Sequence, residues 1–457
     1  MSSRALAEAA IERHEKYGNL LNAYRTFAPE AALTRASLAD EAFAAGRDLG
    51  PLQGVPISVK DLFGVEGMPV YAGTPLRLPP KWEREGPLVA RIQAQLGVIT
   101  GKSHTVEFAL GGLGTNRHYG SPYNPWDPTD QRISGGSSSG AGVSLLEGSA
   151  LVAIGSDTTG SVRMPASMTG TVGLMISHGR WSTEGVVPVS PILDAPGLIT
   201  LTAADLAPAF LALDDSSGDF WGQMAWFEGR GLAGIRIGVP QGLFWEDCSP
   251  GVAEAVEGAL GELERKGVRL VSVDLPDLRA AYDMFESGHL SVAAVYSMIR
   301  QEFPDWWDTL DVNVRDRLTR HGAELPAHEY VQRLRRIESW MQAADGSLAD
   351  LDAIALPTVS TTPAKVADVG SADAYRKHNI AASRNCAITA LFGLSALSMP
   401  VGLDPAGMPV GLQLASRHGR DADLIRLAIA CERALGTRAE RLGEPPLLGA
   451  LSGKWPA

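Results

Sequence analysis

The chain has 457 residues and a formal net charge of −12, from 40 basic and 52 acidic side chains. This balance argues against a nucleic acid or an anionic membrane surface as the main partner. Hydrophobic residues make up 45% of the sequence, which is ordinary for a globular protein with a substantial buried core.

Helices and strands are expected to alternate over the first 200 residues. Apolar residues at helical spacing predict the helices, and β-branched runs bounded by glycine or aspartate predict the strands. We expect helices over 3–17, 29–46, 88–96 and 139–148, and strands over 55–60, 98–100 and 151–155. Residues 111–137 are dense in Gly, Asn, Pro and Asp, which predicts a long ordered loop of the kind that is usually functional.

The alternation continues beyond residue 200 with one interruption. We expect a helix that begins at Thr202, strands over 235–239, 268–273, 353–356 and 396–399, and helices over 252–266 and 421–435. Strands that alternate with helices imply a mainly parallel sheet with helices on both faces. Residues 277–350 have a helical pattern throughout, and we interpret them as a helical insertion beside the substrate pocket, with additional core helix as the alternative.

Signals for disulfides, metal binding and export are missing from the sequence. The three cysteines are widely spaced and odd in number, which fits a reduced compartment and supplies no zinc ligand set. His104, His118 and His178 lack the spacing of metal ligands. The N-terminus lacks the apolar core of a signal peptide, and no charge-free apolar run is long enough to cross a bilayer. We therefore expect a cytoplasmic protein without a metal, a cofactor or a membrane partner.

Lys60 is the first candidate catalytic residue, because it lies in an apolar run with Val55, Ile57 and Val59. Desolvation disfavours the charged form of such a lysine and lowers its pKa. A neutral amine can accept a proton from a serine near physiological pH. The alternative is a lysine at a strand end that pairs with Asp61 or reaches water.

A second candidate is Ser161, in a turn between a predicted strand and a predicted helix. Successive backbone N–H groups at such a junction form an anion site that can stabilise an oxyanion. The candidate oxyanion donors are the amides of Thr158, Thr159, Gly160 and Ser161. Asp157 and Arg163 flank the turn with opposite charges, and we interpret them as a structural pair. The alternative for Ser161 is a simple helix N-cap.

Ser137, in the Gly/Ser-rich run 135–140, can connect these two candidates. A hydroxyl group both donates and accepts, so a serine between a neutral lysine and a nucleophile can relay a proton. The alternative is that residues 135–140 are a flexible linker. Against this, the run leads directly into an apolar pattern that predicts a packed helix.

The same run permits two other interpretations. Residues 136–140 match the G-x-S-x-G nucleophile elbow, with Ser138 as the attacking residue, but that motif should directly follow a buried strand and a polar loop precedes it here. A phosphate-binding P-loop needs a lysine after the glycines, and none follows. We therefore expect Ser138 to support the loop structurally.

Together these motifs resemble those of the amidase signature family. The lysine motif is 54–61, the Gly/Ser-rich signature is 134–140 and the nucleophile turn is 155–166. Further similar segments extend the resemblance over nearly the whole chain. Ser139 and Thr159 stand where many members have glycine, and the Ser139 variant is similar to that of indoleacetamide and mandelamide hydrolases and their bacterial relatives.

The resemblance implies a single α/β domain over residues 1–457, built around a mixed sheet, with a catalytic core at about 50–200. It also implies a Ser–cis-Ser–Lys triad. In this chain Ser161 would be the nucleophile, Ser137 the bridging serine after a cis peptide bond, and Lys60 the base.

The implied activity is hydrolysis of linear amide C–N bonds through a serine acyl-enzyme. Carbamates (urethanes), aryl amides and esters share the tetrahedral geometry and are further candidate substrates. We expect a small amide or carbamate as the partner of a monomer or homodimer. Two alternatives stay open: the glutaminase subunit of a tRNA-dependent amidotransferase, which shares the triad, and a non-catalytic module that uses the glycine loops as a ligand cradle.

Overall fold

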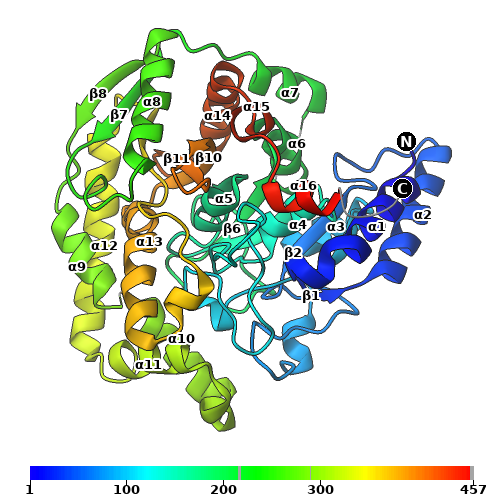
Figure 1. Ribbon diagram of the computed structural model, residues 1–457, viewed down its shortest axis with the longest axis horizontal. Coiled ribbons are helices and arrows are strands. Elements are labelled where there is room, and N and C mark those ends of the chain that lie inside the picture. The colour runs from blue at the N-terminus through cyan, green and yellow to red at the C-terminus, as the bar shows by residue number, and fades with distance from the viewer. Residues whose placement is uncertain (215–217, 289, 453–457) are drawn as a thin grey trace.

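A mixed sheet forms the centre of the computed structural model, which describes residues 1–214, 218–288 and 290–452 (Figure 1). Within these residues the sheet has eleven strands in the order β1-β3-β2-β4-β6-β5-β10-β11-β9-β7-β8. The strands are β1 Tyr24–Phe27, β2 Pro56–Lys60, β3 Val98–Ser103, β4 Val152–Asp157, β5 Val172–Met175, β6 Ala195–Thr200, β7 Arg236–Pro240, β8 Arg269–Val273, β9 Ala353–Pro357, β10 Ser395–Leu403 and β11 Pro409–Ser416. Every strand that the sequence predicts is present.

Parallel pairing is confined to two parts of this sheet. β2 pairs in parallel with β3 and β4, and β7 pairs in parallel with β8 and β9. The other six pairings between described strands are antiparallel. The sheet is mixed, as expected, but it is not mainly parallel. Each antiparallel pair includes at least one of β1, β5, β6 and β11, and the sequence pattern predicts none of these four strands.

The helices that the sequence predicts are also present, with boundaries that differ by a few residues. Outside residues 277–350 the described helices are α1 Ser3–Leu21, α2 Pro29–Ala44, α3 Pro87–Ala94, α4 Ala141–Glu147, α5 Arg163–Thr169, α6 Ala203–Leu213, α7 Phe220–Glu228, α8 Val252–Arg265, α13 Ala372–Leu391, α14 Asp421–Leu435, α15 Arg438–Leu442 and α16 Pro446–Ser452. Side-chain caps explain two of the starts: Ser2 accepts from the amide of Ala5, and Thr202 accepts from the amide of Asp205.

Helices α5 and α14 both pack on β10 and β11 (Figure 1). Successive side chains of a strand point to opposite faces of the sheet. Leu412 and Leu414 lie on one face of β11 and belong to the same hydrophobic cluster as residues of α14. Gln413 lies on the opposite face, where its Oε1 accepts from Arg163 of α5. At Gly411 a Cβ atom would lie 2.5 Å from Ser167 Oγ, so the absence of a side chain lets α5 approach the sheet.

The described part of 277–350, which is all of it except residue 289, contains four α-helices and one 3₁₀ turn. These are α9 Leu278–Glu286, α10 Ser291–Glu302, α11 Val312–His321 and α12 Ala327–Ser347, with the turn at Pro304–Thr309. Figure 1 shows them gathered at one end of the molecule, away from α1 and α2. Helices α9, α11 and α12 contact α13, which connects this helical segment to the rest of the chain. No helix in the described ranges is both long and apolar enough to cross a membrane.

Candidate active site

Lys60 ends strand β2, whose five residues are all buried. Its side chain is fully enclosed, and Nζ lies 2.8 Å from Ser137 Oγ. The other neighbours of Nζ are Ser156 Oγ at 2.9 Å and the Ser156 carbonyl oxygen at 3.2 Å. The amine is thus surrounded by neutral oxygen atoms, and the strand-end alternative, an ion pair with Asp61 or exposure to water, does not apply.

The pKa of Lys60 is lowered to about 7. Burial is the main cause, because it penalises the charged ammonium, and the negative charges of Asp157 and Asp194 act in the opposite direction. A lysine with this pKa is substantially unprotonated near neutral pH. It can therefore accept a proton from a hydroxyl group that is in contact with it.

The loop that carries Ser137 is held by backbone hydrogen bonds on both sides. The peptide bond between Gly136 and Ser137 is cis, as the resemblance implies. The carbonyl oxygen of Ser137 accepts from the amides of Val106 at 3.1 Å and Ser139 at 2.8 Å. The amide of Gly136 donates to Gly112 O at 2.8 Å. Residues 135–140 are therefore an ordered loop and not a flexible linker.

Ser161 lies in the turn between β4 and α5, and it reaches the Ser137 loop through the backbone. Its carbonyl oxygen accepts from the amide of Ser138 at 3.1 Å. Within the described residues, no hydrogen bond joins the hydroxyls of Ser161 and Ser137. Hydrogen bonds of catalytic groups are often long in unliganded enzymes and shorten in the substrate complex. The turn brings the three candidate residues into one region of the molecule.

Asp157 organises this turn from inside. Its carboxylate accepts from the amides of Gly160 at 2.6 Å and Val162 at 3.1 Å. Gly160, expected among the oxyanion donors, thus gives its N–H to Asp157. The physical reason is that a buried carboxylate needs several donors, and the nearest backbone amides supply them. Thr158, Thr159 and Ser161 line the adjacent cavity.

Arg163 pairs with Asp157 as the sequence predicts. Its Nη2 lies 2.9 Å from Oδ1 and its Nε 3.0 Å from Oδ2, and both side chains are fully buried. Burial alone would raise the pKa of Asp157, but the charge and hydrogen bonds of Arg163 lower it. Arg163 Nη1 also donates to Thr389 Oγ1 at 2.7 Å and Gln413 Oε1 at 2.6 Å. The pair fixes the turn to α13 and β11.

Two residues at this site have no role in the sequence prediction. Ser156 contacts Lys60 Nζ through both its hydroxyl and its carbonyl, but a serine near a strand end is too common to be recognised from sequence. Asp194 accepts from Thr158 Oγ1 at 2.6 Å and from the amides of Val189 and Ser190 at 2.8 Å each. Burial raises the pKa of Asp194. Asp194 lies in one of the further segments that resemble the family, and this likeness was the available signal.

Ser138 is fully buried, and its hydroxyl faces the Ser156 carbonyl oxygen at 3.4 Å. It follows an irregular loop and precedes α4, so no strand delivers it to the top of a sheet. The nucleophile-elbow interpretation therefore lacks its required structural setting. Ser138 is better placed to support the loop through its backbone contact with Ser161.

A cavity opens beside Ser161. Thr158, Thr159 and Met164 line it from the catalytic turn and α5, and Gly111 and Gly112 line it from the loop after β3. The helical segment also lines the cavity, through Phe285, Ser291 and Arg317. Helix α13 contributes Asn379 and Ser383. The helical segment thus lies next to the candidate nucleophile.

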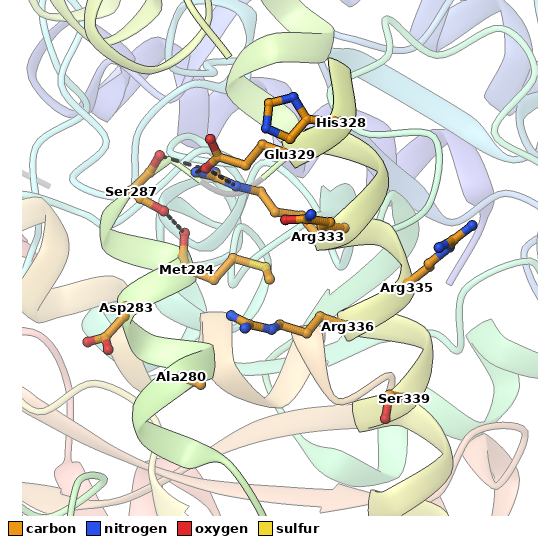
Figure 2. A pocket seen from close by; sticks show the side chains of 11 residues that line it. Ala280, Asp283, Met284, Ser287, His328, Glu329, Arg333, Arg335, Arg336 and Ser339 are labelled. Atoms are coloured by element: carbon orange, nitrogen blue, oxygen red, sulfur yellow. Dashed lines mark hydrogen bonds and ion pairs between the residues drawn. The ribbon is translucent and has the colours of Figure 1, made fainter. Parts of the chain in front are cut away.

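A separate groove lies between α9 and α12 (Figure 2). Arg333 crosses it and donates to Glu329 Oε1 at 2.6 Å and to the Ser287 carbonyl oxygen at 3.4 Å. None of the predicted catalytic residues lines this groove. It is therefore distinct from the candidate active site. Among the described residues, no group of three or more His, Cys, Asp or Glu side chains is placed to hold a metal ion.

Comparison with known proteins supports the motif analysis. The amidase family model matches residues 5–425. A 2-amino-5-chloromuconic acid deaminase from Comamonas testosteroni is 45% identical over 447 residues, which cover 98% of this chain and 96% of that protein. A glutamyl-tRNA(Gln) amidotransferase subunit from Ralstonia nicotianae is 31% identical, with 96% of each chain covered.

A solved structure described as an amidase superposes with a TM-score of 0.84 at 29% sequence identity. The match covers 95% of this chain and 97% of that protein. The described fold is therefore the fold of this family over almost its whole length, with its large mixed sheet and surrounding helices.

Proposed function

The chain belongs to the amidase signature family and is a hydrolase, and we propose that it attacks amide C–N bonds with Ser161, with Ser137 as proton relay and Lys60 as base. The observation that supports these roles is the 2.8 Å contact between Lys60 Nζ and Ser137 Oγ in a fully buried setting. The lowered pKa of Lys60 makes its amine a suitable base near neutral pH.

The proposed reaction begins with proton transfer from Ser161 to Ser137 and from Ser137 to Lys60. Ser161 Oγ forms a bond with the carbonyl carbon, and the tetrahedral intermediate collapses when the C–N bond breaks. The proton returns through Ser137 to the leaving nitrogen. Water then attacks the acyl-enzyme by the same route, which releases the acid and restores the hydroxyl of Ser161.

We assign the oxyanion to the backbone amides of Thr158, Thr159 and Ser161, which line the cavity. Preorganised N–H donors stabilise negative charge that develops on the carbonyl oxygen. Gly160 contributes indirectly, because its amide holds the Asp157 carboxylate and so shapes the turn. Asp157, Arg163 and Ser138 support the geometry and do not react.

The substrate is proposed to be a small molecule that enters the cavity between the turn and the helical segment. The Comamonas testosteroni relative is by name a deaminase that acts on an acid. A primary amide, whose leaving group is ammonia, is therefore the first substrate class to test. Carbamates, aryl amides and esters share the tetrahedral geometry and follow in the same panel. Location in the cytoplasm and a monomeric or homodimeric state stay predictions of the sequence.

A hydrolase that works without an amidotransferase partner is favoured over a glutaminase subunit. The relative at 45% identity has the name of a deaminase, whereas the amidotransferase subunit is 31% identical. Strict dependence on glutamine, together with co-purification of larger partner subunits, would reverse this preference.

Replacement of the nucleophile tests the proposal. Ser161→Ala is expected to lower turnover of a primary amide by about 10⁴-fold, since removal of one member of a catalytic triad has effects of this size. A fluorophosphonate probe, followed by peptide mass spectrometry, should label Ser161 in the wild-type protein.

Ser138→Ala is the matched control, because it removes a neighbouring serine hydroxyl that the proposal leaves unreactive. This variant should still be labelled by the probe at Ser161. Labelling at Ser138, or wild-type turnover by Ser161→Ala, would refute the assignment.

A further inference from the structure

Three arginines of α11 differ in their partners. Arg315 pairs with Asp308 at 3.3 Å, and Arg320 pairs with Asp316 at 2.8 Å. Arg317, between them, has no carboxylate partner among the described residues.

Arg317 lines the cavity that contains Ser161, and it also lines a second cavity nearer to α9 and α13. Phe285 and Asn379 line both cavities as well. The three side chains thus mark the junction between the space beside the nucleophile and the space that leads away from it. Figure 1 shows α11 beside one end of α13, and the two helices are in contact.

The junction also presents neutral donors. Asn379 uses its Oδ1 to accept from the amide of Gly112 at 2.7 Å, which fixes the side-chain amide in one orientation. Its Nδ2 is then the remaining polar atom of that side chain. Ser383 lies one helical turn further along α13 and lines the same cavity. The cavity beside Ser161 is thus lined by arginine and amide N–H donors and, among the described residues, by no acidic side chain, which suits a carboxylate, whereas Glu286 and Asp316 line only the second cavity.

The electrostatic surroundings favour an anion at this junction. Burial lowers the pKa of Arg317, with Tyr375 acting in the opposite direction, but an arginine stays charged at neutral pH. The pKa of His321 is also lowered, first by burial and then by the positive charges of Arg317 and Arg320. A partly buried cation without a counterion is unfavourable, so a bound anion would stabilise it.

We propose that Arg317 binds a carboxylate of the substrate, so that this enzyme selects acyl groups carrying a free carboxylate in addition to the C–N bond that is cleaved. This inference rests on the proposed function, since it places the carboxylate in the same cavity as Ser161. Monoamides of dicarboxylic acids are the substrate class. Water and the monoamide give the dicarboxylate and ammonium: the C–N bond breaks, a C–O bond to the water oxygen forms, and nitrogen takes up both protons of the water.

Matched pairs of substrates test the proposal. Each linear monoamide from succinamate to adipamate is compared with its diamide, in which a neutral carboxamide of similar size replaces the carboxylate. For the best-fitting chain length, the wild-type kcat/KM should favour the monoamide by about 100-fold, a ratio typical of a buried charge pair. Arg317→Gln should bring this ratio close to one, and Arg317→Lys should retain part of it.

Arg315→Gln is the matched control, because it removes a charge from the same helix outside the cavity and should keep the wild-type ratio. A wild-type ratio near one for every chain length, or an unchanged ratio in Arg317→Gln, would overturn the proposal. Diamide turnover by Ser161→Ala at the wild-type rate would instead refute the proposed function.

A binding measurement tests the role of Arg317 without requiring turnover. Calorimetry with the dicarboxylates, from succinate to adipate, compares Ser161→Ala with the double variant Ser161→Ala/Arg317→Gln. The double variant should bind the best-fitting dicarboxylate about 100-fold more weakly. Equal binding by both proteins, or binding by neither, would overturn the proposal even if no amide in the panel is hydrolysed.

Discussion

Lys60 and Lys102 are two buried lysines on neighbouring strands with different surroundings. Both side chains are fully enclosed, and β2 and β3 pair in parallel so that Val59 lies opposite Lys102. Lys102 Nζ contacts a carboxylate, Asp61 Oδ1, at 3.0 Å. Lys60 Nζ instead contacts only hydroxyl and carbonyl oxygens, with Ser137 Oγ at 2.8 Å.

Burial alone therefore does not make a lysine a base. The carboxylate of Asp61 pairs with Lys102, which gives this lysine a structural role. Hydroxyl and carbonyl oxygens provide less compensation for the lost hydration, so the pKa of Lys60 falls to about 7. A contacting carboxylate is present at Lys102, which has a structural role, and absent at Lys60, the proposed base. Replacement of each lysine and variation of pH test this difference.

The largest effect is expected from Lys60→Met, which removes the proposed base and keeps an unbranched side chain. Turnover of a primary amide should fall by about 10⁴-fold, because the proton from Ser161 loses its acceptor. The free energy of unfolding should change little, since a desolvated amine is replaced by an apolar chain. Steady-state kinetics and chemical denaturation measure the two quantities. A variant that keeps more than a tenth of the activity would contradict the role of Lys60.

Lys102→Met is expected to show the opposite pattern. It leaves the Asp61 carboxylate buried without its partner, which should lower the free energy of unfolding by about 3–5 kcal/mol. The folded fraction should retain catalytic activity. The double variant Asp61→Asn/Lys102→Met should recover part of the lost stability, because no unpaired charge remains. If Lys102→Met were as stable as the wild type, Lys102 would not have this structural role.

The pH dependence gives the smallest and most graded effect. Lys60 must lose its proton to act as a base, and its pKa is lowered to about 7. As the pH is raised toward 7, the fraction of enzyme with neutral Lys60 should therefore increase about tenfold per pH unit. Above pH 7 this fraction should level off. The wild-type kcat/KM for a neutral primary amide should follow this curve. A profile that is flat from pH 5 to 9, or that rises only near pH 10, would argue against a neutral lysine.

The sequence predicts the local elements of this fold better than its sheet topology. The apolar run before Lys60 and the strand before Asp157 are correctly expected, because burial imposes a clear residue pattern. Strands such as β5 and β6 follow the catalytic turn in segments rich in glycine and proline, where no strand pattern stands out. Because β5 and β6 form antiparallel pairs in the centre of the sheet, a prediction without these strands does not include those pairs.

At the candidate site too, local motifs are predicted from the sequence, whereas contacts that depend on the three-dimensional fold are not. The motifs identify Lys60, Ser137 and Ser161, and the structure brings their segments together. Sequence cannot reveal that Asp157 occupies the Gly160 amide, because that contact depends on the local turn geometry. Nor can it reveal Arg317, which comes from a distant helical segment whose placement depends on tertiary packing.

The most direct test of the central claim is the titration of Lys60 itself. Protein with ¹³C-labelled lysine side chains is followed by NMR as pH is varied, and the resonance missing from Lys60→Met identifies the residue. This resonance should titrate with a midpoint near pH 7. A Lys60 that stays protonated up to pH 10 could not accept the proton from Ser137, and its proposed role as the base would be wrong.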